Sequence, residues 1–243
     1  MTGLRTVMVR SLVTWFRAFD DVVFPRRCLM TGRYLGTRTT RMPGIDDTAL
    51  DTHRIAPPSY ELFPRIATHF HPDDLALSDV HALYPVGTGT TIQHAIHAVK
   101  YDGRTKLAVA FGEELGTMLT TVAGIHVDAV LPVPIHPARR RERGYNQADF
   151  IARGVARTME IPMIDDALVR THYTGSQTRL DAGQRLKNVR NAIVVRRPDR
   201  VRNLRLLVVD DVLTTGATAN GAAMALLMAG ARRVEAAAIG VAI

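Results

Sequence analysis

Apolar residues in the second half of the chain follow two alternating patterns. Apolar positions at helical spacing predict helices at residues 92–99, 107–119, 146–159 and 217–228. Short continuous apolar runs predict strands at residues 127–134, 191–195, 204–210 and 233–243. Because strands that alternate with helices usually pair in parallel, this order predicts an α/β fold with a mostly parallel sheet flanked by helices. In such folds, ligands bind at the carboxyl ends of the strands.

The first part of the chain lacks a repeating pattern. Turn-forming residues interrupt it at Pro25, 43–44, 57–58, Pro72 and Pro85. Because proline and glycine favour turns, this part is predicted to consist of short helices and loops. We therefore expect an N-terminal segment at residues 1–88 and a sheet-containing domain at residues 89–243.

The run LLVVDDVLTTGAT (206–218) joins a predicted strand to a predicted helix. Its apolar part, 206–209, is typical of a parallel strand that is covered on both faces, so Asp210 and Asp211 are expected at the carboxyl end. Residues 214–218 then enter the helix, where free backbone N–H groups and threonine hydroxyls favour a phosphate. Two carboxylates beside a phosphate suit a ligand that also carries hydroxyls, or a cation. The alternative is an ordinary capped turn, which explains the hydroxyls but not the paired acids.

Composition and charge indicate which cysteine chemistry, cellular compartment and kind of ligand to expect. The 243 residues include one cysteine, Cys28, which excludes an intramolecular disulfide and a four-cysteine zinc site. Arginines interrupt the first segment, which predicts no signal peptide, and no apolar run is long enough to insert into a membrane, so we expect a cytoplasmic protein. The net charge is +8, and residues 136–205 hold 16 Lys and Arg against 7 Asp and Glu. This excess indicates either a polyanion as ligand or solvated helix faces.

The acidic run resembles the phosphoribosyl pyrophosphate (PRPP) signature of type I phosphoribosyltransferases over all 13 positions. The resemblance implies that Asp210 and Asp211 hold the ribose hydroxyls and stabilise positive charge that develops on the sugar. It also implies that Mg²⁺ accompanies PRPP. The residues that would hold the 5-phosphate are Thr214, Thr215, Gly216, Ala217 and Thr218.

Three further stretches resemble the ComF family of competence-associated phosphoribosyltransferase-like proteins. They are AIHAVKYDGR (95–104), LPVPIHPARRRERGYNQADFIA (131–152) and SQTRLDAGQRLKNVRNAI (176–193). The resemblance implies a pyrophosphate loop at Val133, Pro134, Ile135 and His136, and a hood over the site that includes Gln177, Arg185 and Asn188. Arginine forms strong charged hydrogen bonds to phosphate, which suits a basic shell around the leaving pyrophosphate. The candidates for this shell are Arg139, Arg140, Arg141, Arg143, Arg179, Arg185 and Lys187.

The chain departs from the ComF pattern near its start. Typical members carry a four-cysteine zinc module there, whereas this chain has Cys28 and then Thr31 at the place of a second cysteine. Because thiolates supply the affinity of such a site, no zinc of the family type is expected. The histidines that could rebuild a site with Cys28 are His53, His69, His71 and His81, and the HFH run is expected to place two imidazoles on one face of a strand.

Two classes of function follow from the resemblance. The first is an enzyme that binds PRPP with Mg²⁺ and transfers ribosyl 5-phosphate to an acceptor, which the sequence does not identify, with release of pyrophosphate. The second is a non-catalytic accessory protein of DNA uptake that senses PRPP or binds single-stranded DNA or other competence proteins. Aromatic residues for base stacking are sparse in the basic stretch, where Tyr145 and Tyr173 are the candidates.

Overall fold

We describe the chain from a computed structural model. The described residues are 26–36, 39–51, 55–87, 90–171 and 193–242. Contacts divide the chain into two compact units, residues 1–52 and residues 53–243, which are described separately below. None of the described helices is both long enough and apolar enough to cross a membrane.

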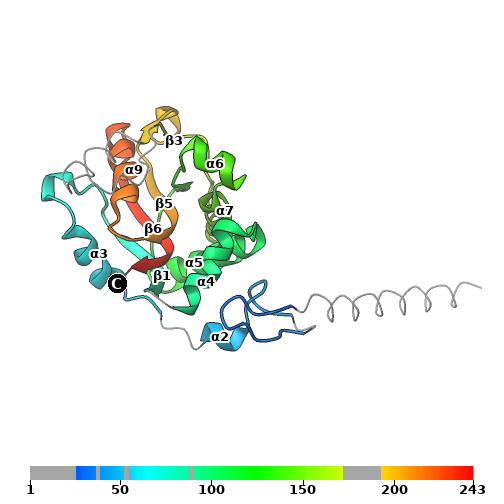
Figure 1. Ribbon diagram of the computed structural model, residues 1–243. Helices are drawn as coiled ribbons and strands as arrows, with labels where there is room; N and C mark the ends of the chain where they lie inside the picture. Colours follow the sequence, from blue (N-terminus) through cyan, green and yellow to red (C-terminus); the bar gives the residue numbers. More distant parts are fainter. Residues whose placement is uncertain (1–25, 37–38, 52–54, 88–89, 172–192, 243) are drawn as a thin grey trace, which may run out of the picture. The chain divides into compact units, whose positions relative to one another are not determined.

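The second unit is built around a parallel sheet (Figure 1). Its described strands are β1 (Val80–Val86), β2 (Ala129–Pro132), β5 (Arg205–Leu213) and β6 (Arg233–Ala242). They lie in the order β1-β6-β5-β2, and every neighbouring pair is parallel. The predicted α/β class with a mostly parallel sheet is therefore confirmed.

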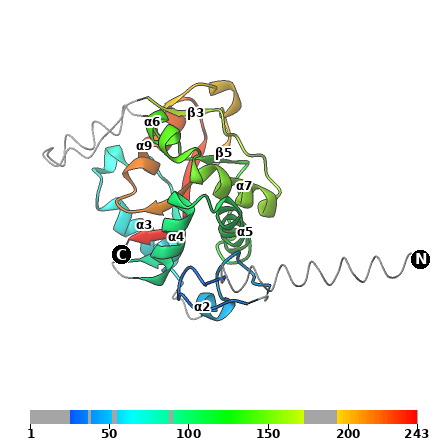
Figure 2. The same cartoon turned by 45° about the vertical axis from the view of Figure 1, so that its right-hand side comes forward.

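Helices cover both faces of this sheet (Figures 1 and 2). One face carries α3 (Ser59–Ala67) and α9 (Ala217–Met228), and the other carries α5 (Thr105–Thr121) and α7 (Gln147–Met159). The two central strands are consequently buried on both sides, β6 from Val234 to Val241. This double burial explains why both strands are nearly continuous apolar runs.

Four predicted helices and three predicted strands occur close to their expected positions. The helices are α4 (Thr91–Tyr101), α5, α7 and α9, and the strands are β2, β5 and β6. The predicted strand at 191–195 corresponds to β4 (Ile193–Val195), but β4 pairs antiparallel with β3 (Leu168–Arg170) in a separate small sheet. Two 3₁₀ turns, η1 (Pro72–Asp74) and η2 (Pro198–Arg200), complete the described elements of this unit together with α6 (Pro137–Arg143).

Two expectations for the first 88 residues are wrong. The strand β1 lies in a stretch for which only short helices and loops were expected, and it pairs with β6 in the main sheet. His69 and His71 do not lie on a strand: His69 is in the turn after α3, and His71 caps η1. Neighbouring prolines obscured β1, whose edge position tolerates Pro85.

The first unit retains a tight turn around its cysteine. Cys28 is buried, and its backbone N–H donates to the carbonyl of Arg33 at 2.8 Å while its carbonyl accepts from Gly32 at 2.8 Å. The thiol Sγ accepts a hydrogen bond from the backbone N–H of Asp46 at 3.3 Å, next to the short helix α2 (Asp47–Asp51). The sulfur thus has a structural partner within its own unit.

Candidate functional site

Asp210 and Asp211 lie on β5, just beyond the point where the neighbouring strand β2 ends. The last pair between β2 and β5 joins Pro132 to Val209, and the N–H of Val133 then donates to the carbonyl of Val209 at 2.8 Å. On its other side, β5 continues to pair with β6 through Asp210 and beyond. Asp210 and Asp211 therefore border the space that opens above the end of β2.

That space is a cavity of about 230 Å³. The structure brings nine of the predicted site residues to its wall: Val133, Pro134, Ile135, His136, Arg139, Arg143, Asp210, Asp211 and Thr218. Three further lining residues were not predicted: Lys100, Gln147 and Arg170. The predicted hood residues Gln177, Arg185 and Asn188, as well as Arg179 and Lys187, lie outside the described residues.

Asp211 is buried and held by two side chains from the neighbouring helices. The ammonium Nζ of Lys100, on α4, lies 3.1 Å from its Oδ1. The amide Nε2 of Gln147, at the start of α7, donates to its Oδ2 at 2.6 Å. Both carboxylate oxygens thus have protein partners, so Asp211 joins α4 and α7 to the end of β5.

Asp210 has a different environment. Its Oδ1 accepts the backbone N–H of Asp211 at 2.8 Å. Burial first, and then the neighbouring charge of Asp211, raise the pKa of Asp210 to about 7, although Lys100 and Arg170 oppose the change. Near neutral pH, the cavity therefore contains a carboxyl group that is protonated in part of the molecules, and no other side chain of the described residues donates a hydrogen bond to it.

The sequence Arg-Gly-Tyr-Asn-Gln at residues 143–147, here called the Arg-Gly-Tyr-Asn-Gln element, connects the walls of the cavity. The guanidinium of Arg143 donates to Gln147 Oε1 at 3.0 Å and to the Tyr101 hydroxyl at 3.2 Å, and it lies 4.8 Å from the centre of the Tyr101 ring. Gly144 ends α6 with φ of 82°, a left-handed conformation that glycine adopts without strain. Arg143 is thereby linked through Gln147 to Asp211.

The middle of the element is tied to two other segments. The hydroxyl of Tyr145 donates to the carbonyl of Val99 at 2.6 Å, which fastens the turn to α4. Asn146 is buried, and its Nδ2 donates to the carbonyl of Val133 at 3.1 Å. Its Oδ1 accepts from the N–H of Ala148 at 3.3 Å and caps α7. These bonds hold the loop after β2 beside the end of β5.

The threonine-rich turn leads from β5 into α9. Gly216 has φ of 74° and is buried, and a Cβ at this position would lie 2.7 Å from Ile66 Cγ2. Glycine is therefore required for both backbone conformation and space. Thr214 and Thr215 are exposed, Ala217 and Thr218 are half-buried, and Thr218 lines the cavity. The N–H of Ala217, the first residue of α9, donates to Thr215 Oγ1 at 3.4 Å, and the next N–H groups of the first turn precede the residues that have partners within the helix.

Four cations line the same cavity as the two acids. They are Lys100, Arg139, Arg143 and Arg170. Burial lowers the pKa of Arg170, and the nearby charge of Arg139 lowers it further, while Asp210 raises it. The accumulated positive charge favours a multiply charged anion. Arg140 and Arg141, also on α6, are exposed and do not line the cavity.

Comparison with known proteins gives relatives in one functional context. No family model matches the chain. The DNA utilization protein YhgH of Escherichia coli K12 is 33% identical over 146 residues, which cover 58% of this chain and 63% of that protein. Competence protein F of Haemophilus influenzae is 33% identical over 109 residues, which cover 44% of this chain and 48% of that protein. Competence protein ComFC of Bacillus subtilis is 25% identical over 139 residues, which cover 57% of this chain and 55% of that protein. The resemblance to the ComF family is confirmed.

The chain spans less than two thirds of the length of these ComF-type relatives. Among solved structures, it is similar to glutamine PRPP amidotransferase from B. subtilis in complex with ADP and GMP. That similarity has a TM-score of 0.40 and 22% identity, and it covers 58% of this chain and 30% of the other.

The stretches that resemble the ComF family include two of the three cavity residues that were not predicted. Lys100 belongs to the stretch AIHAVKYDGR and Gln147 to the Arg-Gly-Tyr-Asn-Gln element, but neither position alone indicates a contact with Asp211. Arg170 lies outside the matching stretches, at the end of β3. Its place in the cavity depends on the small sheet, which the sequence did not predict.

Proposed function

We propose that the chain binds PRPP together with Mg²⁺ and transfers the ribosyl 5-phosphate group to an acceptor nucleophile. The observation that carries the proposal is the cavity in which two acids, four cations and the start of α9 meet. A phosphorylated sugar diphosphate has groups that suit each of these three parts. The acids suit its hydroxyls, the cations suit its pyrophosphate, and the helix start suits its 5-phosphate.

Different side chains bind different parts of PRPP in this proposal. Asp210 accepts hydrogen bonds from the ribose hydroxyls, while Asp211 keeps Lys100 and Gln147 in place. Arg139, Arg143 and Arg170 offer donors to the pyrophosphate. The loop from Val133 to His136 places this group between α6 and the acids. Mg²⁺ would enter with PRPP, and it would supply positive charge beside the leaving group.

The proposed reaction exchanges one bond at C1 of the ribose. The bond between C1 and the pyrophosphate oxygen breaks, and pyrophosphate leaves with the electron pair. The acceptor then forms a bond to C1 and gives up a proton. Positive charge on the ring in the transition state is stabilised by the neighbouring carboxylate of Asp210, and negative charge on pyrophosphate by the cations.

Calorimetry on the purified full chain tests the binding step. We expect Mg·PRPP to bind with one site per chain, and ribose 5-phosphate and pyrophosphate to bind more weakly, because each occupies only part of the cavity. A screen of bases and amines for pyrophosphate release then tests turnover. A folded sample that shows neither heat nor thermal stabilisation with Mg·PRPP would contradict the proposal.

The names of the relatives favour a second candidate function. Proteins of DNA utilisation and competence suggest a non-catalytic accessory that senses PRPP or binds single-stranded DNA or competence proteins. The exposed Arg140 and Arg141 on α6 are suitable for a DNA backbone, although the guanidinium of Arg140 also lies 3.7 Å from the carboxylate of Asp149. Tyr145 is less suitable for base stacking, because its hydroxyl is bonded to Val99 and its ring is half-buried against Phe150. The other stacking candidate, Tyr173, lies outside the described residues.

Two matched double variants of α6 separate the candidates. Replacing Arg139 and Arg143 with Gln is expected to weaken PRPP and pyrophosphate binding by about 100-fold, because two charged hydrogen-bond donors leave the cavity wall. Replacing Arg140 and Arg141 with Gln removes the same charge from the exposed side of the helix and should change PRPP binding less than about twofold. Binding is measured by calorimetry at two salt concentrations, with single-stranded DNA as the second ligand.

The DNA-binding function predicts a different dependence on salt and a different effect of the two double variants. DNA affinity would fall steeply with salt, because each neutralised phosphate of a single strand releases about 0.7 counterions. The exposed pair would then matter at least as much as the cavity pair. Tight, salt-sensitive DNA binding, with PRPP binding unchanged in the Arg139 and Arg143 variant, would reject the PRPP cavity in favour of the DNA surface.

A further inference from the structure

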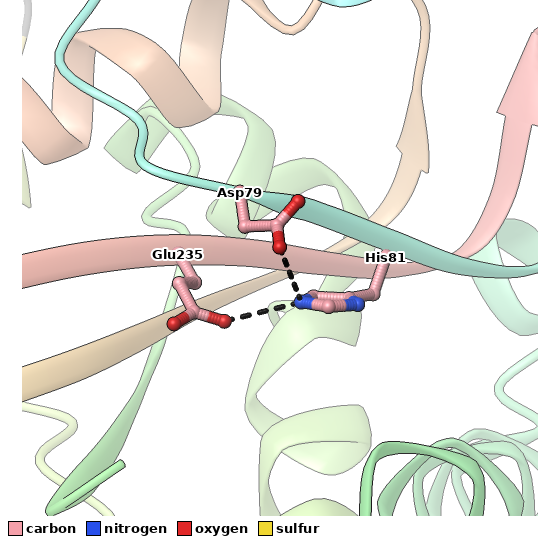
Figure 3. A group of neighbouring side chains, drawn as sticks. All are labelled: Asp79, His81 and Glu235. Carbon is pink, nitrogen blue, oxygen red and sulfur yellow. Dashed lines mark hydrogen bonds and ion pairs between the residues drawn. The ribbon is translucent and has the colours of Figure 1, made fainter. Parts of the chain in front are cut away.

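A histidine and two acids meet at the amino end of the sheet, away from the cavity (Figure 3). His81 is the second residue of β1 and Glu235 the third residue of β6, the neighbouring parallel strand. Asp79 lies directly before β1. The side chains of His81 and Glu235 are 4% and 6% exposed, and that of Asp79 is 27% exposed. The group is thus buried on one side and reachable by solvent at Asp79.

One ligand atom of each side chain is directed toward a common point. The Nε2 of His81 lies 3.1 Å from Glu235 Oε2 and 4.0 Å from Asp79 Oδ2. All three atoms lie within 4.8 Å of one another. Ligands that share a metal ion at about 2.0–2.2 Å are separated by roughly 3–4 Å, so these atoms are close to coordinating positions.

The second oxygen of each carboxylate is held by a different donor. Glu235 Oε1 lies 3.1 Å from the Nε of Arg233. Asp79 Oδ1 accepts from the Ser59 hydroxyl and, at 2.8 Å, from the backbone N–H of Val80. These outer partners direct Oε2 and Oδ2 toward the imidazole. Such outer hydrogen bonds orient the carboxylate ligands of metal sites in the same way.

A proton on His81 Nε2 can serve only one of the two carboxylates. A hydrogen on His81 Nε2 can form a hydrogen bond with Glu235 at 3.1 Å, but Asp79 Oδ2 at 4.0 Å is beyond hydrogen-bond distance. A cation that lies between the three atoms interacts with all of them at once. Its positive charge also faces two carboxylates, of which Glu235 is almost fully buried and has Arg233 as a further partner.

We propose that Asp79, His81 and Glu235 bind one divalent transition-metal ion, with water completing its coordination. One imidazole and two monodentate carboxylates form a ligand set that suits Zn²⁺, Co²⁺ or Mn²⁺. The site is separate from the four-cysteine module of the family, because it contains no thiolate. It is also separate from the PRPP cavity: Glu235 pairs with Leu207, three residues before Asp210 on β5.

The metal would join two strands that are far apart in the sequence. Asp79 and His81 flank the start of β1, and Glu235 lies on β6, so a common ion fixes the edge strand to the centre of the sheet. Ser59 extends this connection to α3 through Asp79. The ion is therefore expected to stabilise the folded state by mass action.

Metal titration of the intact chain tests this proposal. After removal of metal with a chelator, Co²⁺ is added with Mg²⁺ in excess, and visible absorption reports the coordination; calorimetry with Zn²⁺ gives the affinity. We expect one Co²⁺ or one Zn²⁺ to bind per chain. We also expect Zn²⁺ to raise the melting temperature of the protein. Asp79→Asn and Glu235→Gln should each weaken binding at least about tenfold. The control Asp73→Asn, next to the exposed His71, should leave the affinity unchanged.

Three outcomes would overturn the proposal. They are the absence of stoichiometric binding, binding that neither variant weakens, and sulfur-to-cobalt charge-transfer absorption that places the ion at Cys28. Asp79 is partly exposed and outside the strand, so Asp79→Asn tests the site even if Glu235→Gln does not fold. The comparison does not involve PRPP, so its result is independent of the proposed function.

Discussion

Replacing Asp210 with Asn is expected to weaken PRPP binding by about 100-fold and, above pH 7, to raise the melting temperature. The loss of binding follows because two charged hydrogen bonds from ribose hydroxyls become neutral ones, and a weakening of about 1.4 kcal/mol in each corresponds to about 100-fold in total. The gain in stability follows from the raised pKa of Asp210, about 7, because the folded protein keeps this carboxylate charged only at a cost.

The raised pKa of Asp210 also sets the sign of the pH dependence of stability. Between pH 3.8, the ordinary pKa of the carboxyl group, and about pH 7, Asp210 binds more protons in the folded protein than in the unfolded protein. Its contribution to stability is greatest below the lower value and is lost as pH rises through the higher one. The Asn side chain does not ionise, so the variant should melt about 4 °C or more above the wild type at pH 8, and the difference should shrink toward pH 4.

Asp211→Asn provides the matched control. The same substitution one residue later removes the charge that faces Lys100 and alters the acceptor of Gln147, so the variant should melt below the wild type at pH 8. Thermal unfolding from pH 4 to pH 8 and calorimetry with Mg·PRPP measure both effects. Equal shifts in the two variants, or unchanged PRPP affinity in Asp210→Asn, would contradict the different roles of the acids.

Gly154→Ala is expected to destabilise the fold strongly, although it adds a single methyl group. The backbones of α5 and α7 meet at their glycines, and a Cβ on Gly154 would lie 2.2 Å from the carbonyl oxygen of Val109 and 2.7 Å from the N of Glu113. Both neighbours are helix backbone, so the helices must separate. We expect a loss of about 3 kcal/mol or more in the free energy of unfolding, which lowers the melting temperature by about 6 °C or more.

Gly87→Ala is the control for this prediction. Its added Cβ would meet Thr90 Cγ2 at 3.9 Å, an ordinary van der Waals contact, so its melting temperature should stay within about 2 °C of the wild type. Thermal unfolding of both variants, followed by circular dichroism, measures the difference. A Gly154→Ala protein as stable as Gly87→Ala would show that the two helices do not pack through their glycines.

The sequence by itself determined the features that depend on neighbouring residues. The apolar run before Asp210 and the turn at Gly216 predicted a strand, a turn and a helix in the correct order, because strand burial and helix starts leave local patterns. The α/β class followed from the alternation of such elements. The edge strand β1 escaped this method, since its short stretch contains Pro85 and lies among other turn-forming residues.

Only the tertiary structure decided how distant residues act on one another. Asp210 and Asp211 are identical in type and adjacent, yet Lys100 and Gln147 hold one of them while burial raises the pKa of the other. The meeting of His81 with Glu235 depends likewise on the register between β1 and β6, 154 residues apart in the chain. These contacts arise when strands pair and helices cover them, and no local pattern records the partners, because the same residues could satisfy the local rules with other neighbours.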